Sequence, residues 1–415
     1  MHCMKRLSAC MAGALFMVGA ATASPDEDLL GKQQGYPRAP RLSSIHDPAY
    51  IVGSFSGMDR ITSHCELAPA EQPSSLRASA TQAAVRYRFG GREHTLADYM
   101  EHQRATAVLI VKDGEIIAER YGYGRTAAMR MLSNSMAKTL VALAVGQALE
   151  DGSIKSLQDT ADQYVPGLTG TLYGGTRLVD LLRMASGAKY VEDYTDTDDR
   201  KRFLVTAATR GVLAAAAQVK ERSDPPGSRF NYAGAQTEVL GLVLRAATHR
   251  SLCSFIDETI WKPMGAQSKA TFLVRASDDS EIAQGGFNAT ARDYARLGWM
   301  LANDGMAQDR QVISRDYLLD MTDPARQPED FRPGRMDYHG RTYYGYGFQT
   351  WLLPGKTRQF ALLGVYGQAI YVDPQLKLVM VHLAVGKDAS GDASGAHLGA
   401  ERDALWRGLV AGMAR

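Results

Sequence analysis

Cysteine is scarce in this chain of 415 residues, which contains only four; Cys3 and Cys10 lie within the first ten residues. A dense disulfide framework is therefore excluded. The spacing of Cys65 and Cys253 suits no metal site, and the nine histidines are scattered without an H-E-x-x-H motif. We therefore expect no bound metal. Cys65 and Cys253 could pair in an oxidising compartment or remain two buried thiols, and the sequence favours neither state.

A long hydrophobic run is also missing. Lys5 and Arg6 precede an apolar stretch over 7–20, and Ala21-Thr22-Ala23 has the small-x-small form of a cleavage site. This order predicts a secretory signal peptide over 1–23 and a periplasmic or secreted protein. The stretch is shorter than the ~20 residues of a membrane span, so we expect no stable span. Lipid anchoring at Cys10, in a lipoprotein-like Leu-Ser-Ala-Cys box, is a minor alternative because the apolar run mostly follows that cysteine.

The chain has no marked excess of charge. It carries 47 basic and 45 acidic residues, and removal of Lys5 and Arg6 with the signal leaves 45 of each. A nucleic-acid partner is not expected, because binding to phosphates needs clustered Lys and Arg. The balanced charge suits an enzyme for a small substrate, and the oligomeric state stays open.

Proline is concentrated near the N-terminus, with six of the 15 prolines between residues 24 and 75. Such a segment disfavours long helices, and we interpret 24–94 as an arm on the main body. The body, 95–415, has strand patterns at both ends and mostly helices over 155–320. The predicted fold is α/β (α+β layered): an antiparallel sheet flanked by helices, with a mostly helical inserted subdomain. The predicted strands are 107–111, 115–121, 346–352, 359–363, 369–372 and 376–384, and the predicted helices are 135–150, 179–184, 238–247, 291–301 and 397–413.

The chemistry-bearing pattern is S-x-x-K, which occurs at Ser135–Lys138 and again at Ser186–Lys189. No G-x-S-x-G elbow occurs, which disfavours an α/β-hydrolase. Ser135 begins a helix that is apolar nearly all round, and the i, i+3 spacing places Lys138 on the same face. The N–H groups at a helix start favour a developing oxyanion and disfavour an ammonium, so the pair could be nucleophile and base. A helix cap and a surface lysine are the alternative. Ser186 lies before Gly187 at a helix stop, which favours a structural turn.

Several segments in order resemble the serine β-lactamase and penicillin-binding superfamily, in particular its class C branch. Within that branch the sequence of these segments is most similar to that of aminohexanoate-oligomer hydrolases. The matching segments are Ser135-Met136-Ala137-Lys138, Leu181–Gly187, Pro226–Tyr232, Gly285–Asp293 and Gly364–Gln368.

The resemblance implies an exported serine hydrolase that cleaves an amide or ester of a small substrate and needs no cofactor. Ser135 would form the acyl-enzyme, and Lys138 and Tyr232 would handle protons, in an order that the sequence leaves open. The oxyanion hole would consist of the backbone N–H groups of Ser135 and Gln368. The predicted substrate-binding residues are Tyr194, Tyr366 and Gly367; the last two lie in Gly364–Gln368, where the family has its third motif. Tyr194 belongs to a Glu-Asp-Tyr stretch that could equally be an acidic surface loop.

Two positions depart from the family pattern. Tyr232-Ala233-Gly234 lacks the asparagine of Y-x-N, and Val365-Tyr366-Gly367 lacks the cation of K-T-G or H-x-G. Both changes disfavour a β-lactamase or D,D-peptidase, which stays as the alternative enzyme. A non-catalytic binding or sensor protein on the same fold is the second alternative; the presence of Ser135, Lys138 and Tyr232 disfavours it.

Overall fold

A computed structural model describes residues 24–389 and 398–413. The predicted signal peptide, with Cys3 and Cys10, lies outside the described residues. The helices are α1 (Pro48–Phe55), α2 (Leu96–His102), α3 (Ala137–Glu150), α4 (Leu178–Leu182), α5 (Asp199–Arg210), α6 (Val212–Gln218), α7 (Gly234–Thr248), α8 (Leu252–Ile256), α9 (Ala291–Ala302), α10 (Arg315–Thr322) and α11 (Leu398–Met413).

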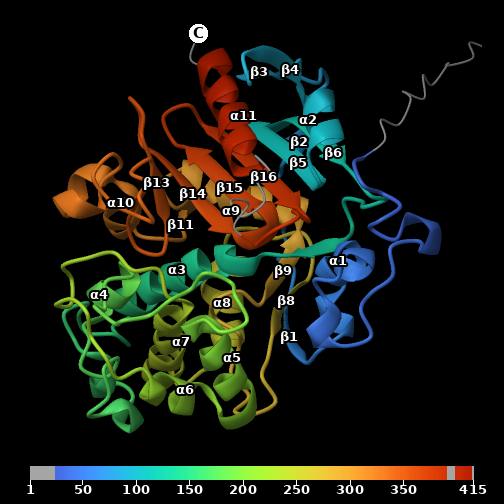
Figure 1. Cartoon of the computed structure of the whole chain (residues 1–415). Helices are drawn as coiled ribbons and strands as arrows, with labels where there is room; N and C mark the ends of the chain where they lie inside the picture. Colours follow the sequence, from blue (N-terminus) through green and yellow to red (C-terminus); the bar gives the residue numbers. More distant parts are fainter. Residues whose placement is uncertain (1–23, 390–397, 414–415) are drawn as a thin grey trace, which may run out of the picture.

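An eight-stranded sheet forms the centre of the molecule, in the order β12-β13-β14-β15-β16-β5-β6-β2 (Figure 1). Its neighbours pair antiparallel, apart from the parallel edge pair β2 and β6. Strands from both parts of the body therefore meet in one sheet, which confirms the predicted fold class. The strands are β2 (Arg77–Ala78), β5 (Ala105–Lys112), β6 (Glu115–Tyr121), β12 (Gly345–Tyr346), β13 (Trp351–Leu353), β14 (Gln359–Gly364), β15 (Gln368–Asp373) and β16 (Leu378–Ala384).

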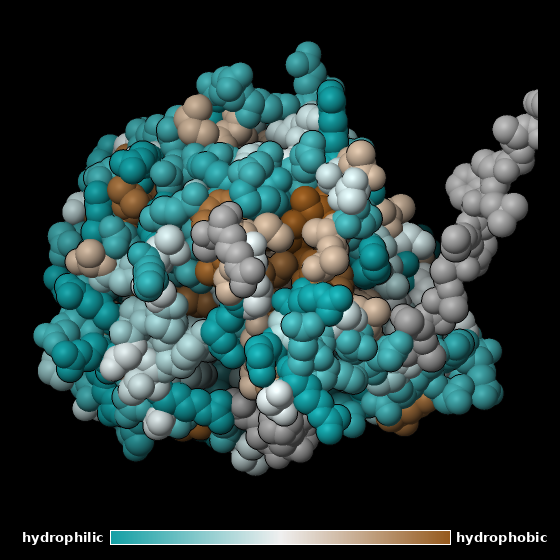
Figure 2. Space-filling view, turned by 90° about the horizontal axis from the view of Figure 1, so that it is seen from above, coloured by the Kyte–Doolittle hydropathy of each residue, from teal (hydrophilic) through white to brown (hydrophobic). Residues whose placement is uncertain are grey.

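The central strands are covered on both faces. Alternate residues of β5 point to opposite sides: Val108 and Ile110 share a core with Trp406 of α11, whereas Leu109 and Val111 belong to the larger core that contains α3 and α9. Burial on both sides explains why β5 and β16 are nearly continuous apolar runs. In Figure 1, α11 lies above the sheet and α9 and α3 lie below it. The outer face shown in Figure 2 is mostly hydrophilic, with apolar residues gathered near its middle.

A smaller four-stranded sheet, β1-β8-β9-β7, joins the N-terminal segment to the body. Its strands are β1 (His64–Leu67), β7 (Arg130–Leu132), β8 (Ala270–Leu273) and β9 (Phe287–Thr290). Cys65 on β1 and Cys253 on α8 form a disulfide with a Cα–Cα distance of 6.4 Å. The question of the cysteine pairing, open in the sequence, is thus answered by the structure.

The segment 24–94 lies on the body and takes part in its sheets. It contributes β1 and β2, the short helix α1, and a hairpin of β3 (Arg86–Phe89) with β4 (Arg92–Thr95). Proline does not prevent α1, because Pro48 occupies the first turn, where its missing N–H has no helical partner.

The predicted strand 346–352 is wrong in its middle. β12 ends at Tyr346, a turn follows in which the Gly347 N–H donates to Thr350 at 2.9 Å, and β13 begins at Trp351. Gly347 packs so closely on Met321 that an added Cβ would meet its carbonyl oxygen at 1.8 Å. That close contact bends the chain at a position that apolar alternation alone does not reveal.

The predicted helical insert is also less uniform than its pattern indicated. Helices α4 to α8 form a layer on one side of α3, at the bottom of Figure 1. However, 155–320 also contains β8, β9 and the minor hairpin of β10 (Met306–Ala307) with β11 (Arg310–Gln311), and α9 packs on the central sheet. Among the described residues no single helix is long and apolar enough to cross a membrane; α7 and the helix after it pass that test only as a pair bent by 76°.

Candidate active site

Ser135 lies in a single 3-10 turn, Asn134–Met136, between β7 and α3. Asn134 adopts a left-handed φ of 45°, which Asn tolerates better than most residues. Its side-chain amide donates to the Val365 carbonyl at 3.0 Å, so the turn is tied to the third motif. Ser135 itself is half-buried. The regular helix thus begins two residues later than predicted, and the nucleophile candidate sits on a fixed turn at its entrance.

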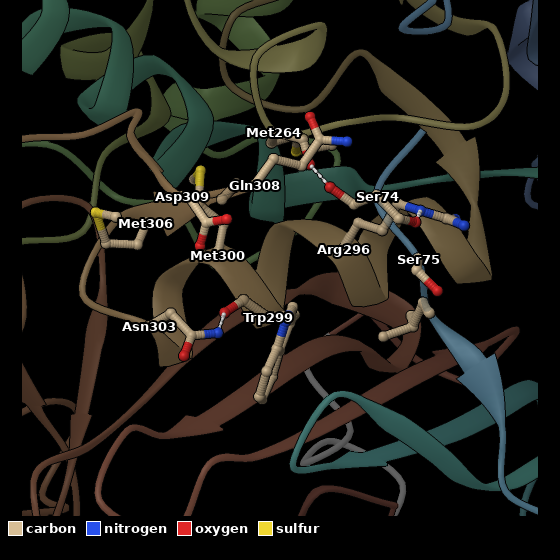
Figure 3. A pocket seen from close by; sticks show the side chains of 12 residues that line it. Ser74, Ser75, Met264, Arg296, Trp299, Met300, Asn303, Met306, Gln308 and Asp309 are labelled. Carbon is tan, nitrogen blue, oxygen red and sulfur yellow. Dashed lines mark hydrogen bonds between the residues drawn. The ribbon is translucent and has the colours of Figure 1, made fainter. Parts of the chain in front are cut away.

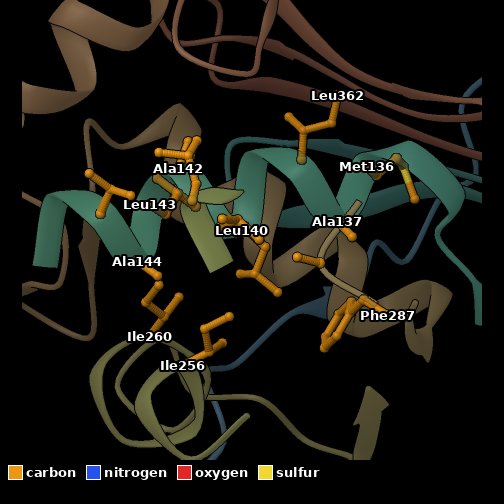
Figure 4. Packing of buried hydrophobic residues seen from close by; sticks show 14 of the residues in the cluster. Met136, Ala137, Leu140, Ala142, Leu143, Ala144, Ile256, Ile260, Phe287 and Leu362 are labelled. Atoms are coloured by element: carbon orange, nitrogen blue, oxygen red, sulfur yellow. The ribbon is translucent and has the colours of Figure 1, made fainter. Parts of the chain in front are cut away.

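Helix α3 is held on all sides by apolar packing, as its sequence predicted. Figure 4 shows Leu140 and Ala144 facing Ile256 and Ile260, with Leu362 on the opposite side. Every residue from Ala137 to Gly146 is buried. Such packing fixes the helix position, so the side chains of its first turn have little freedom to move.

Lys138 points back toward Ser135 and is only 2% exposed. Its Nζ donates to Ser135 Oγ at 2.9 Å and to the Gln284 carbonyl at 2.7 Å. Burial lowers the pKa of Lys138 to about 8, although the negative charges of Glu192 and Glu238 oppose the shift. A buried lysine that is partly neutral near pH 8 can accept a proton from the serine hydroxyl.

Tyr232 stands beside the same two residues. Its ring centroid lies 5.2 Å from Lys138 Nζ and stacks on Trp351 at 5.7 Å. Burial raises the pKa of Tyr232 well above its usual value of ~10, and a hydrogen bond with Ser135 acts in the opposite direction. Tyr232 is therefore neutral at physiological pH and is suited to donate a proton.

The Pro-Gly turn before Tyr232 is joined to the Ser-Gly turn after α4. The Gly227 N–H donates to the Ala185 carbonyl at 2.7 Å, and the Asn231 N–H donates to Met184 at 2.8 Å. Gly227 has a φ of 82°, a conformation that favours glycine. Two of the motifs found in the sequence therefore fit together, and their contact places Tyr232.

The second S-x-x-K motif does not form a catalytic pair. Ser186 is buried and its Oγ accepts the Ala188 N–H at 3.3 Å. Lys189 is exposed and its Nζ pairs with Glu221 at 2.9 Å. The turn thus has the structural role that its Ser-Gly sequence predicted.

Gln284 and Glu192 are two site residues that the sequence analysis did not single out. Gln284 precedes the Gly285-Gly286 pair and presents its carbonyl to Lys138. Glu192 is buried and accepts the Gly234 N–H at 2.7 Å and the Tyr194 hydroxyl at 3.2 Å. Burial raises the pKa of Glu192, and the Lys138 charge counteracts that effect. The Glu-Asp-Tyr stretch was the available signal for Glu192, but only its tyrosine was assigned a role.

The same contacts explain why Gly234 stands where class C enzymes have asparagine. A Cβ at this position would lie 2.0 Å from Gln284 Oε1 and 3.4 Å from Glu192 Oε2. The side-chain amide of Gln284 occupies the space that a side chain at position 234 would need. A larger residue there would require Gln284 to move.

The third-motif segment, Gly364–Gln368, lies beside Ser135 at the C-terminal end of β14. An added Cβ on Gly364 would lie 3.1 Å from the Ser135 backbone nitrogen, so these two strips of backbone are in contact. Gln368, the predicted oxyanion donor, is buried at the start of β15, and its side-chain Nε2 donates to the Ala384 carbonyl at 2.7 Å. The carbonyl of Gly367 accepts from His382 Nδ1 at 2.6 Å. His382 is fully buried, and burial lowers its pKa to about 3, so it stays neutral.

The two predicted substrate-binding tyrosines lie around this centre. Tyr194 is close enough to Tyr232 to contribute to the raised pKa of Tyr232, after the larger effect of burial, and the Arg200 guanidinium lies over the Tyr194 ring at 4.8 Å. Tyr366 has a left-handed φ of 60° and stacks on His46 of the N-terminal segment at 4.9 Å. The Glu-Asp-Tyr stretch is thus part of the site's surroundings, and so is the segment before the body.

A separate hollow, shown in Figure 3, lies along the C-terminal half of α9. Arg296, Trp299 and Asn303 are among its lining residues, and Ser135, Lys138 and Tyr232 are not. Its arginine is already bound to Asp293 and to the Ser74 carbonyl. Within residues 24–389 and 398–413, no group of three or more His, Cys, Asp or Glu side chains could hold a metal ion.

A sequence model of the Beta-lactamase family matches residues 93–403 of this chain. The chain belongs to the β-lactamase family. It is 27% identical over 333 residues to the 6-aminohexanoate-dimer hydrolase of Paenarthrobacter ureafaciens, covering 76% of this chain and 82% of that protein. These matches confirm the resemblance to the serine β-lactamase superfamily and to aminohexanoate-oligomer hydrolases.

Solved structures agree in fold with this member of the β-lactamase family. A provisional 6-aminohexanoate-dimer hydrolase from Bacillus anthracis superimposes with a TM-score of 0.75 at 24% identity, covering 93% of this chain and 98% of that one. A family VIII carboxylesterase gives 0.56 at 18% identity, covering 74% and 93%. The protein is a β-lactamase-related hydrolase of the amidase and esterase type.

Proposed function

We propose that this protein is an exported, class C-like serine hydrolase that cleaves an amide or ester of a small substrate through an acyl-enzyme on Ser135. The observation that carries the proposal is the buried Lys138, whose Nζ lies 2.9 Å from Ser135 Oγ. The similarity to a 6-aminohexanoate-dimer hydrolase supports a small amide as substrate. The missing asparagine and cation, together with the filled space at Gly234, argue against a β-lactam antibiotic.

We propose an order for the proton transfers, which the lowered pKa of Lys138 and the raised pKa of Tyr232 support. Neutral Lys138 takes the proton of Ser135 as Oγ forms a bond to the substrate carbonyl carbon. The hydroxyl of Tyr232 protonates the departing nitrogen or oxygen as its bond to that carbon breaks, and Tyr232 regains a proton from the Lys138 ammonium. Water then attacks the acyl-enzyme, gives up one proton through the same two groups and releases the acid. Ser135 is regenerated with its hydroxyl proton.

The developing oxyanion would accept hydrogen bonds from the backbone N–H of Ser135 and from the turn that includes Gln368. Loss of one such donor commonly costs ~10²–10³ in rate.

A fluorophosphonate probe followed by intact-mass measurement tests the nucleophile. We expect one adduct on the wild-type protein and none on Ser135→Ala, with Ser186→Ala labelled like the wild type. Labelling that persists in Ser135→Ala would place the nucleophile elsewhere. Turnover of a chromogenic cephalosporin, without turnover of short esters or the aminohexanoate dimer, would favour a β-lactamase instead.

Export is the remaining part of the proposal. The signal-like order of residues 1–23 supports it, and the disulfide between Cys65 and Cys253 suits an oxidising compartment. The mature protein should begin at Ser24 and be recovered from the periplasm or medium. Retention of residues 1–23 on a protein found only in the cytoplasm would contradict export, and a lipid-modified Cys10 would identify the minor alternative.

A further inference from the structure

Arg200 is a cation of the site that the proposed mechanism does not use. It lies in the first turn of α5, and its guanidinium carbon is 4.8 Å from the ring centroid of Tyr194. About a fifth of the side chain is exposed, with a relative accessibility of 21%. Arg200 is thus a positive charge at the border between the site and solvent.

Arg200 forms an ion pair with the buried carboxylate of Asp198, in which Nε lies 3.6 Å from Oδ2. At that distance the Nε–H makes no hydrogen bond. The Asp198 oxygens are occupied by the loop and the helix start, because they accept the backbone N–H groups of Tyr194 at 2.8 Å and Lys201 at 2.6 Å. Within the described residues, Arg200 forms no side-chain hydrogen bond. The ion pair is made through Nε, so the two terminal nitrogens of the guanidinium are left to donate to a ligand that reaches the exposed part of the side chain.

The charge of Arg200 acts on groups on several sides of the site. It contributes to lowering the pKa values of Lys138 and His46, both of which burial lowers most. It also opposes the upward pKa shift that burial causes in Tyr366. The guanidinium, which lies over the ring of Tyr194, is thus within electrostatic range of both Lys138 and the stacked pair of His46 and Tyr366. The position is near the third motif, where this chain lacks the cation of its relatives' pattern.

We propose that Arg200 forms an anion subsite that binds a carboxylate of the substrate, so that the preferred substrates are small amides or esters carrying a carboxylate away from the scissile bond. This inference rests on the proposed function. A planar guanidinium presents paired donors that match a carboxylate, and a partly buried site strengthens the interaction. The cation would be supplied by α5 in place of the third motif.

Two pairs of matched esters test the subsite, one with the carboxylate on the acyl group and one with the carboxylate on the leaving group. The first pair is mono-4-nitrophenyl adipate and 4-nitrophenyl hexanoate, in which the acyl chain ends in a carboxylate or a methyl group. The second is 4-acetoxybenzoate and 4-acetoxybenzamide, in which the leaving group carries the carboxylate or a neutral amide. The quantity measured is the ratio of kcat/KM for the anionic member to that for the neutral member, in wild type and in Arg200→Gln.

We expect the wild type to prefer the anionic member of at least one pair, and Arg200→Gln to lower that ratio about 10- to 100-fold, the range of a charge-assisted hydrogen bond. Arg200→Lys should restore part of the ratio. Arg202→Gln is the matched control: it removes the same charge from the same helix, but Arg202 is exposed and paired with Asp199. Its ratio should equal that of the wild type.

The outcomes separate this inference from the function on which it rests. Efficient hydrolysis of the neutral members without preference for either anionic one would overturn the subsite and leave the hydrolase intact. An equal ratio in wild type and Arg200→Gln, or an equal fall in Arg202→Gln, would do the same. No hydrolysis of any ester, combined with no fluorophosphonate adduct on Ser135, would overturn both.

Discussion

The two S-x-x-K motifs of this chain have the same spacing of serine and lysine, but one lysine is buried and the other is exposed. At the first, Lys138 is 2% exposed, and its ammonium or amine contacts Ser135 and the Gln284 carbonyl. At the second, Lys189 extends into solvent toward Glu221, whose hydrogen bond raises its pKa. Burial on a helix therefore prepares one lysine to lose its proton, whereas an exposed ion pair keeps the other charged. The S-x-x-K pattern identifies a serine and a lysine that could react together, and the packing around them determines whether the lysine can lose its proton.

The largest expected difference between the motifs lies in activity. Lys138→Ala should reduce kcat/KM by about 1,000-fold or more, because it removes the proton acceptor beside Ser135. Steady-state kinetics with a short ester would measure the loss, and circular dichroism would show whether the fold survives. Near-normal turnover by a folded Lys138→Ala protein would remove this lysine from the mechanism.

The pH dependence should report the buried lysine. Because neutral Lys138 is the active form and its pKa is about 8, kcat/KM should rise through pH 8 and level off above it. The Glu192 charge raises that pKa, so Glu192→Gln should move the midpoint to lower pH. A pH–rate profile of both proteins checks the direction. A midpoint that moves upward in Glu192→Gln would contradict the assignment of Lys138 as the base.

Ser186→Ala should affect stability without affecting chemistry. The substitution leaves the Ala188 N–H without its side-chain acceptor, which should lower the free energy of unfolding by about 1 kcal/mol. Urea denaturation measures this change, and kcat/KM should match that of the wild type. A large kinetic loss in a stable Ser186→Ala protein would show that the turn takes part in the reaction.

Lys189→Ala should have the smallest effect. Both partners of the Lys189–Glu221 pair are exposed, with side-chain accessibilities of 68% and 72%, so solvent screens the interaction. Kinetics, pH profile and thermal midpoint should all stay close to those of the wild type. A shifted pH profile in this variant would mean that the two motifs are not independent.

Local patterns predicted much of the fold. The predicted strands 107–111 and 115–121 are confirmed as β5 and β6, and the strands from the two parts of the body share one sheet. The strand predicted across Gly347 failed, because the contact with the Met321 carbonyl is made by a residue far away in the sequence. Similarly, the short helix α1 forms within a proline-rich segment, since its proline lies at the helix start.

The candidate site divides in the same way. Ser135, Lys138 and Tyr232 were found from their motifs, and the structure brings them together. Glu192, Gln284 and Arg200 were not found. The first two act through contacts made across the fold, Glu192 on Gly234 and Gln284 on Lys138. Arg200 belongs to no motif, and only the structure shows that it is more buried than Arg202 and lies over the Tyr194 ring.

The sequence by itself determined the family, the nucleophile motif and the order of the strands and helices, because these depend on short-range spacing and on hydrophobic periodicity. Tertiary structure alone decided that Lys138 contacts the Gln284 carbonyl and that Cys65 meets Cys253. It also decided that Gly234 lies against the Gln284 side chain and that Arg200 lies over the ring of Tyr194. Each of these depends on desolvation or on close contact between segments far apart in the chain. The spacing of neighbouring residues predicts neither desolvation nor such contacts.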